Sequence, residues 1–269
     1  MNNKMNIPLS GIIPPLVTPL LDDDVLDVEG LQRLIEHLIA GGVHALFVLG
    51  TTGESQSLSY KLRVEMIKNT CRIAKGRLPV LVCISDTSIV ESVNLACLAA
   101  DHGADAVVSA PPYYFATGQP ELIEFYEHLL PQLPLPLFLY NMPTHTKVSF
   151  APATIQRIAE NPGVIGFKDS SANTVYFQSV MYAMKDNPDF SMLVGPEEIM
   201  AEFNQLFVNL LGQFAASGKC GDSDRGNRHR LLQQFYVWHN IPPKCMSLKI
   251  LSLFITSDPR VSQGVFSKC

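Results

Sequence analysis

The sequence predicts an α/β protein, with a (β/α)8 TIM barrel as the leading fold. The chain has 269 residues, which is close to the length of eight strand–helix units. Short apolar runs, typical of parallel strands covered on both faces, alternate with amphipathic stretches typical of helices. This alternation repeats roughly every thirty residues, as a barrel requires. A doubly wound open sheet shows the same alternation and is the structural alternative.

Each element of this alternation has a local signal. The apolar runs that predict strands are residues 11–16, 45–49, 80–84, 106–109, 135–140, 164–167 and 192–194. The stretches with helical spacing are residues 27–40, 60–75, 88–102, 120–130, 152–160 and 174–185. Ser88 and Asn173 suit helix N-caps, and Gly42, Gly76 and Gly103 suit the exits from helix C-termini.

Composition narrows the class of protein. Hydrophobic residues make up 47% of the chain and charged residues 17%, which is enough for a large buried core. The formal net charge of −5 gives no broad electrostatic reason to bind nucleic acid or an anionic membrane. No apolar run approaches the roughly 18 residues that span a bilayer. Pro8, Pro14 and Pro15 interrupt the N-terminal region, so we expect no signal-peptide core and a cytoplasmic protein.

The six cysteines do not suggest a metal or disulfide site. They lie at positions 71, 83, 97, 220, 245 and 269, with no C-x-x-C pair. The first three fall in apolar stretches, where cysteine usually behaves as a small hydrophobic residue. We therefore expect a reducing compartment and no metal ligand set. Motifs of the H-E-x-x-H, P-loop and G-x-G-x-x-G types are absent from the sequence.

Polar residues collect where a barrel would use them. In this fold the active site lies at the carboxyl ends of the strands. The residues that follow the apolar runs at those ends are 51–54, 111–114, 140–141, 168–169 and 195–196. Hydroxyl, phenol, amine and carboxyl groups dominate these positions, so the strand ends are the predicted site.

Lys168 is the candidate nucleophile. In a strand with period 2, Gly166 and Lys168 share one face, while Ile165 and Phe167 share the other. If the second pair packs under the helices, Lys168 points into the barrel, where an apolar interior disfavours the charged amine. An uncharged amine attacks a ketone to form an imine, which acts as an electron sink for the adjacent bond. The alternative is a lysine at a strand end paired with Asp169.

Two further groups of residues have both a chemical and a structural interpretation. Tyr140 ends its apolar run, where a phenol near an imine can transfer protons, although it can equally be a packing residue. Thr51, Thr52 and Gly53 follow a strand and offer hydroxyl and backbone N–H groups to a carboxylate. They can also form an ordinary loop, with Ser57 or Ser59 capping the next helix.

Five motifs together resemble the dihydrodipicolinate synthase and N-acetylneuraminate lyase family of pyruvate-dependent class I aldolases. They are GIIPPLVTP at 11–19, GTTGE at 50–54, GADAVVSAPPYY at 103–114, YNMP at 140–143 and GFKDS at 166–170. The resemblance covers roughly residues 7–200. It implies a lyase that forms a Schiff base between a lysine and pyruvate or a related 2-oxo acid, with no other cofactor.

The resemblance also implies roles for individual residues. Lys168 matches the imine-forming lysine, and Tyr140 matches the tyrosine that acts as general acid and base. Thr51 matches a threonine that links this tyrosine to a second tyrosine, and Tyr114 matches that second tyrosine, which the family lends across a dimer interface. A homodimer or homotetramer is therefore implied. The resemblance also assigns residues to substrate binding: Thr52 and Gly53 on the pyruvate carboxylate, and Gly195 beside the pocket.

One position departs from the synthase branch of the family. An arginine that binds the carboxylate of aspartate semialdehyde is expected after the Tyr-Asn motif, and His145 stands there. Histidine lacks the bidentate guanidinium fork and is largely neutral near pH 7. We therefore expect a 2-oxo acid aldolase of another specificity, with Thr144 and His145 facing the aldehyde acceptor. The alternatives are 4-hydroxy-tetrahydrodipicolinate synthase and N-acetylneuraminate lyase.

The last quarter of the chain departs more strongly. Residues 203–269 carry eight Lys and Arg against three Asp, whereas residues 1–202 carry twelve basic and twenty-two acidic residues. We predict seven barrel units over residues 1–202 and a divergent segment over 203–269. That segment is a divergent closing part, an alternative exon or a changed reading frame, and the last two are favoured. A non-catalytic barrel that retains a 2-oxo acid pocket is the rival functional hypothesis.

Overall fold

A computed structural model describes residues 5–196 of the chain. All of them belong to the first of the two units into which the chain divides, Met1–Leu211. The described strands are β1 (Leu20–Asp22), β2 (Val25–Leu26), β3 (Leu46–Val48), β4 (Val80–Cys83), β5 (Ala106–Ser109), β6 (Leu137–Asn141), β7 (Val164–Asp169) and β8 (Ser191–Val194). The α-helices are α1 (Val28–Ala40), α2 (Tyr60–Ala74), α3 (Ile89–Asp101), α4 (Gln119–Leu129), α5 (Pro143–Thr146), α6 (Pro152–Ile158) and α7 (Thr174–Ala183). Three short 3-10 helices are η1 (Thr51–Gly53), η2 (Ser55–Ser57) and η3 (Leu130–Gln132).

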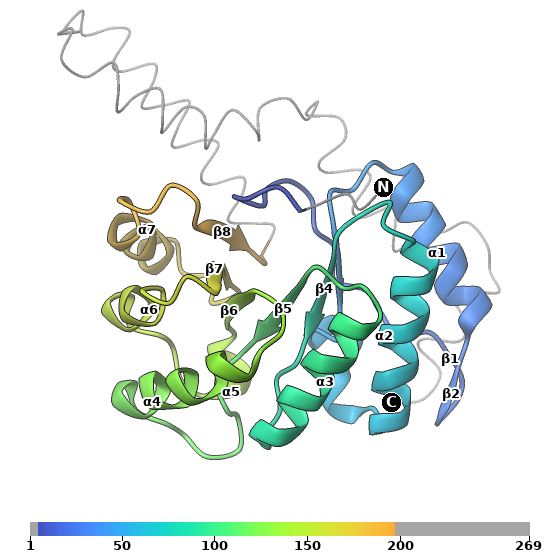
Figure 1. The fold of residues 1–269 in the computed structure, drawn as a ribbon, viewed down its shortest axis with the longest axis horizontal. Coiled ribbons are helices and arrows are strands. Elements are labelled where there is room, and N and C mark those ends of the chain that lie inside the picture. The colour runs from blue at the N-terminus through green and yellow to red at the C-terminus, as the bar shows by residue number, and fades with distance from the viewer. Residues whose placement is uncertain (1–4, 197–269) are drawn as a thin grey trace, which may run out of the picture. The chain divides into compact units, whose positions relative to one another are not determined.

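Six strands form one parallel sheet in the order β3-β4-β5-β6-β7-β8. Each strand lies beside the next strand in the sequence, without the reversal of order that defines a doubly wound sheet. Helices surround the strands on the outside (Figure 1). The sheet of the described residues therefore has the strand order of a barrel wall, and the open-sheet alternative is wrong for this part of the chain.

The sheet is strongly curved. The amine of Lys168 on β7 lies 4.5 Å from the ring centroid of Phe47 on β3, although three strands separate β7 from β3 in the sheet. The rings of Phe47 and Tyr140, on β3 and β6, lie 6.1 Å apart. Because strands that are not neighbours touch through their inward side chains, these residues occupy the concave interior of the sheet.

The predicted first strand at residues 11–16 is only partly formed. It contributes a single parallel bridge between Pro15 and Phe47, beside β3. The Leu16 N–H donates to the Phe47 carbonyl at 2.8 Å, and the Phe47 N–H donates to the Pro14 carbonyl at 3.2 Å. Pro14 and Pro15 have no N–H to donate, so the regular ladder cannot form there.

The same N-terminal segment also reaches the opposite edge of the sheet. The Leu9 N–H donates to the hydroxyl of Ser191 on β8 at 2.8 Å, and both residues are buried. Residues 9–16 therefore contact β8 at one edge of the sheet and β3 at the other. The described chain is close to a ring at this end.

The helices begin where their capping side chains predict. The Ser88 hydroxyl accepts a hydrogen bond from Glu91 N at the start of α3, and the Asn173 amide oxygen accepts one from Tyr176 N at the start of α7. Ser59 caps α2 in the same way. Asp27, predicted as the first helical residue, is instead the N-cap of α1. These caps satisfy N–H groups that the first turn leaves without a partner.

Several sequence predictions lie outside the described residues. They include the divergent segment 203–269 and the cysteines at 220, 245 and 269. Among residues 5–196, the cysteines at 71 and 83 are buried, as predicted, but Cys97 is exposed on α3 and the prediction was wrong there. No helix in this part of the chain is long and apolar enough to cross a membrane.

Candidate active site

Lys168 lies inside the curved sheet, as the period-2 argument predicts. Its amine is 4.4 Å from the ring centroid of Tyr140 and 4.5 Å from that of Phe47. On the other face of β7, the fully buried Phe167 packs against Phe150 and Tyr176, with ring centroids 6.2 and 6.4 Å away. The aromatic layer behind the strand therefore directs the lysine side chain inward.

The absence of a side chain at Gly166 leaves room for this arrangement. Gly166 pairs with Phe138 across β6 and β7, two residues before the pairing of Tyr140 with Lys168. A Cβ atom at Gly166 would lie 2.4 Å from Cε1 of Phe138 and 2.7 Å from the carbonyl oxygen of Ser191. The Phe138 ring occupies this space directly below the lysine, so β7 requires glycine at this position.

Tyr140 and Thr51 meet through their hydroxyl groups. The two oxygens are 3.1 Å apart, with Tyr140 at the end of β6 and Thr51 in η1, just after β3. Only 4% of Tyr140 is exposed, and burial raises the pKa of its phenol. Hydrogen bonds to Thr51 and Ser170 act in the opposite direction on this pKa. The phenol is thus a protonated group at neutral pH, a few ångströms from an amine.

The turn after β3 presents the backbone N–H groups of Thr51 and Thr52 as hydrogen-bond donors. The Gly53 N–H donates to the Gly50 carbonyl and the Glu54 N–H to the Thr51 carbonyl, both at 3.0 Å. Within residues 5–196, the N–H groups of Thr51 and Thr52 make no hydrogen bond. Gly53 has a steric role, because a Cβ atom there would lie 2.9 Å from the Leu16 carbonyl oxygen. The turn can therefore bind an anion through Thr51 and Thr52.

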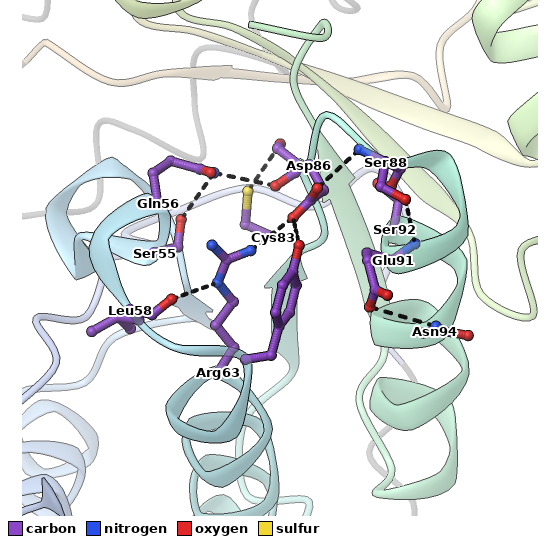
Figure 2. Close-up of polar contacts among 12 residues, drawn as sticks. Ser55, Gln56, Leu58, Arg63, Cys83, Asp86, Ser88, Glu91, Ser92 and Asn94 are labelled. Carbon is purple, nitrogen blue, oxygen red and sulfur yellow. Dashed lines mark hydrogen bonds and ion pairs between the residues drawn. The ribbon is translucent and has the colours of Figure 1, made fainter. Parts of the chain in front are cut away.

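Polar contacts join η2 and α2, which follow the turn, to the loop after β4, as Figure 2 shows. The Gln56 side chain donates to the Ser85 carbonyl at 3.2 Å. The Arg63 guanidinium donates to the Asp86 carboxylate at 2.8 Å, and both side chains are less than 10% exposed. These contacts tie the segment that follows Thr51 in the sequence to the loop after β4.

Three residues of the interior were not among the predicted site residues. Phe47 contacts both Lys168 and Tyr140, as described above. Cys83 ends β4, and burial raises the pKa of its thiol, while hydrogen bonds from Ser85 and the charge of Lys168 oppose that shift. Ser170 follows Lys168 by two residues, so strand alternation was the signal that identifies it.

Gly195 lies beside this group, at the end of β8. Its N–H donates to the Asp169 carbonyl at 2.7 Å. A Cβ atom at Gly195 would lie 2.2 Å from the Ser170 hydroxyl oxygen. The structure therefore brings Lys168, Tyr140 and Thr51 together, with Ser170 and Gly195 at the side.

Two predicted site residues lie at the rim instead. Tyr114 is 72% exposed in the loop after β5, and its ring stacks edge-on against Phe115 at 4.9 Å. His145 is exposed in α5, and its Nδ1 atom lies 2.9 Å from the Thr144 hydroxyl oxygen. Neither residue contacts Lys168, Tyr140 or Thr51 through a hydrogen bond among the described residues. In the described part of the chain, no three His, Cys, Asp or Glu side chains converge as a metal site.

The chain is similar in sequence and in fold to known proteins. Residues 8–209 match the Dihydrodipicolinate synthetase family. A probable 2-dehydro-3-deoxy-D-pentonate aldolase of Escherichia coli (strain K12) is 32% identical over 191 residues, which are 70% of this chain and 64% of the relative.

Solved structures agree with this match. A dihydrodipicolinate synthase from Bacteroides thetaiotaomicron has 99% sequence identity and a TM-score of 0.72, over 74% of this chain and 66% of that chain. The prophage protein YagE from Escherichia coli K12, solved in complex with pyruvate, has 28% identity and a TM-score of 0.70, over 84% of this chain and 83% of that one.

The shared region has clear limits. The match to the family ends at residue 209, close to the change in composition after Glu202. The chain spans about two thirds or less of the length of several relatives that it matches. The matched region still includes all of the described strands, together with Lys168, Tyr140, Thr51, Ser170 and Gly195. The chain therefore belongs to the dihydrodipicolinate synthetase family.

Proposed function

We propose that this chain is a class I aldolase-type lyase, in which Lys168 forms a Schiff base with pyruvate or a related 2-oxo acid. The observation that carries the proposal is the position of the Lys168 amine, 4.4 Å from the ring of Tyr140 inside the curved sheet. Names of relatives support the reaction class, since they include synthases and aldolases of this family. The YagE complex with pyruvate supports the kind of substrate.

The chemistry requires one amine and one proton-transfer group. The uncharged Lys168 amine attacks the ketone carbon, and a proton from the Tyr140 phenol lets the resulting hydroxyl leave as water. In the protonated imine, the Tyr140 phenolate takes the proton of the C4 hydroxyl, the bond between C3 and C4 of a longer 2-oxo acid breaks, and its electron pair moves to the imine nitrogen to form an enamine. The aldehyde leaves, C3 takes up a proton, and water releases pyruvate. The imine itself is the electron sink, so the proposal includes no other cofactor.

The turn after β3 is the proposed carboxylate site. The N–H groups of Thr51 and Thr52 have no hydrogen-bond partner among the described residues, and the Thr51 hydroxyl already contacts Tyr140. A pyruvate carboxylate placed there would orient the ketone toward Lys168. Gly53, packed against the Leu16 carbonyl, and Gly195, packed against the Ser170 hydroxyl, are proposed to lie beside this position.

The aldehyde acceptor is proposed to meet Thr144 and His145. His145 has one ring nitrogen beside the Thr144 hydroxyl and no guanidinium fork for a second carboxylate. This favours a hydroxylated aldehyde over aspartate semialdehyde as the acceptor. Assays of pyruvate with aspartate semialdehyde, and of 2-dehydro-3-deoxy sugar acid cleavage, separate the two. Turnover restricted to aspartate semialdehyde would refute this part of the proposal.

The complete enzyme is proposed to be a closed (β/α)8 barrel that assembles as a homodimer or homotetramer in the cytoplasm. Contact of residues 9–16 with both β3 and β8 supports closure. The exposure of Tyr114 and Phe115 supports assembly, since two large aromatic side chains in water favour burial against another surface. In that assembly, Tyr114 of one protomer is proposed to reach Thr51 of another.

Reductive trapping tests the proposal. The chain is incubated with pyruvate and sodium borohydride, and its intact mass is measured. We expect the mass of one reduced pyruvyl group, which Lys168→Ala abolishes. Lys185→Ala is the matched control, because the Lys185 amine also lies 4.4 Å from an aromatic centroid but is exposed on the outside. The rival hypothesis is a non-catalytic barrel, and the end of the family match at residue 209 is the reason to test it. Wild-type protein without an adduct would favour that hypothesis.

A further inference from the structure

Asn141 and Asp169 form a buried pair directly behind the two proposed catalytic residues. Asn141 follows Tyr140 on β6, Asp169 follows Lys168 on β7, and the two are paired across the strands. The Asn141 amide donates to the Asp169 carboxyl at 2.8 Å. Neither residue is exposed to solvent. Because side chains alternate along a strand, this pair lies on the opposite face from Tyr140 and Lys168.

The pair is also joined to the loops on both sides. The Asn141 amide oxygen accepts hydrogen bonds from the Phe150 N–H at 3.2 Å and from the Ser149 hydroxyl at 3.3 Å. The Asp169 carboxyl accepts from the Ser171 N–H at 3.1 Å and from the Ser171 hydroxyl at 2.8 Å. The pair thus connects β6, β7 and the end of the loop that carries Thr144 and His145.

The ladder between β6 and β7 needs such a connection. At its base, Leu137 pairs with Val164, but the next residue, Phe138, pairs with Gly166, so one residue of β7 is skipped. A bulge of this kind interrupts the regular hydrogen bonds. A slip of one residue in a strand turns every side chain to the other face, which would remove the lysine from the interior. The pairing at the carboxyl end of these strands therefore decides where the lysine points.

We propose that Asn141 and Asp169 are positioning residues, whose hydrogen bond fixes the register in which the Tyr140 phenol faces the Lys168 amine. This inference rests on the proposed imine chemistry. The pair touches no substrate. Its contribution is to hold the two reacting groups at a constant separation and to tie the segment that carries Thr144 and His145 to the same strands.

Exchanging the amide of Asn141 and the carboxyl of Asp169 between their two positions tests the proposal in the full-length chain. Asn141→Asp opposes two carboxyl groups, and the double variant Asn141→Asp with Asp169→Asn restores one amide facing one carboxyl. The assay is the exchange of pyruvate methyl hydrogens for deuterium, which follows from reversible enamine formation and needs no aldehyde. Adduct formation with borohydride gives the number of competent sites, and thermal unfolding gives stability. Asn94→Asp, an exposed exchange on α3, is the matched control.

We expect Asn141→Asp to lower the maximal exchange rate about 100-fold, the loss that a misplacement near 1 Å produces, with little change in half-saturating pyruvate. The double variant should recover to within about tenfold of wild type, since hydrogen-bonded pairs couple energetically. If Asn141→Asp does not fold, the comparison of the double variant with wild type decides the question.

Two results would overturn the proposal: an unchanged exchange rate in Asn141→Asp, or a folded double variant that remains as slow as the single one. A purely structural role predicts lower thermal stability with an unchanged rate per competent site. If wild type itself gives neither adduct nor exchange, the proposed function fails as well, and that outcome is distinct from a failure confined to the variants.

Discussion

Replacing Tyr140 by phenylalanine removes one oxygen from the centre of the proposed site. The ring and its contacts with Phe47 and with the Lys168 amine are retained. The hydrogen bond to Thr51, with 3.1 Å between the oxygens, is lost. The change therefore separates the chemistry of the phenol from the packing of its ring.

The magnitude follows from the environment of the hydroxyl. A positioned acid–base group contributes about 10² to 10⁴ in rate, which corresponds to roughly 3–5 kcal/mol of activation free energy. The effect on folding is smaller, because Thr51 is exposed and its hydroxyl can bind water instead. We expect Tyr140→Phe to lower the free energy of unfolding by only about 1 kcal/mol.

Deuterium exchange into the pyruvate methyl group measures the first effect, and urea unfolding measures the second. Tyr176→Phe is the control, since it removes a phenol that donates to the Phe150 carbonyl at 2.7 Å outside the sheet interior. We expect the control to lose stability and keep its exchange rate. An exchange rate in Tyr140→Phe within threefold of wild type, or an equal loss in the control, would refute the role of the phenol.

Three more perturbations follow from the structure. Gly166→Ala places a Cβ atom 2.4 Å from Phe138 and should lower the free energy of unfolding by about 3 kcal/mol in urea unfolding, because the strand cannot shift freely. Arg63→Met removes the ionic partner of the buried Asp86 carboxylate, which keeps hydrogen bonds from Tyr60 and Ser88, and should cost about 3 kcal/mol in the same assay. Burial raises the pKa of Cys71 to about 12. At a pH above the ordinary thiol pKa near 9, the unfolded thiol loses its proton while the folded one keeps it. The free energy of unfolding should therefore fall with rising pH, by up to about 1.4 kcal/mol per pH unit. Cys71→Ala should reduce that slope.

Each of these changes has a matched control in the chain. Gly163→Ala meets only the end of the Asn161 side chain, at 3.1 Å, and should be nearly neutral. Arg157→Met breaks half-exposed ion pairs with Glu127 and Glu160 and should cost much less stability than Arg63→Met. Cys97→Ala, at an exposed position on α3, is the control for Cys71→Ala. A control that behaves like its buried counterpart would contradict the reasoning from burial.

Local patterns predicted much of the fold because they depend on local physics. The continuous apolar runs became parallel strands, and the caps at Ser88 and Asn173 became helix starts. The run at residues 11–16 has the same apolar character but does not form a regular strand, because proline removes the N–H that the ladder needs. Cys97 was predicted to be buried from the apolar character around it, and its position on the outer face of α3 exposes it.

The site was only partly predictable for a different reason. Alternation along one strand places Lys168 inside, and this requires no knowledge of other strands. The contact between Lys168 and Phe47 joins β7 to β3, and it depends on the curvature of the whole sheet. No local pattern encodes such a contact, so Phe47 and Cys83 were missed. The roles of Tyr114 and His145 depend on a second protomer and on a substrate, and they stay predictions.

The most direct measurement is the location of the borohydride-trapped pyruvate adduct by peptide mass spectrometry. Lys168 and Lys185 lie in the same region of the chain, one inside the curved sheet and one on its outer surface. We predict a single adduct on Lys168 that forms at low pyruvate concentration. An adduct on Lys185, or labelling spread over many lysines, would contradict it.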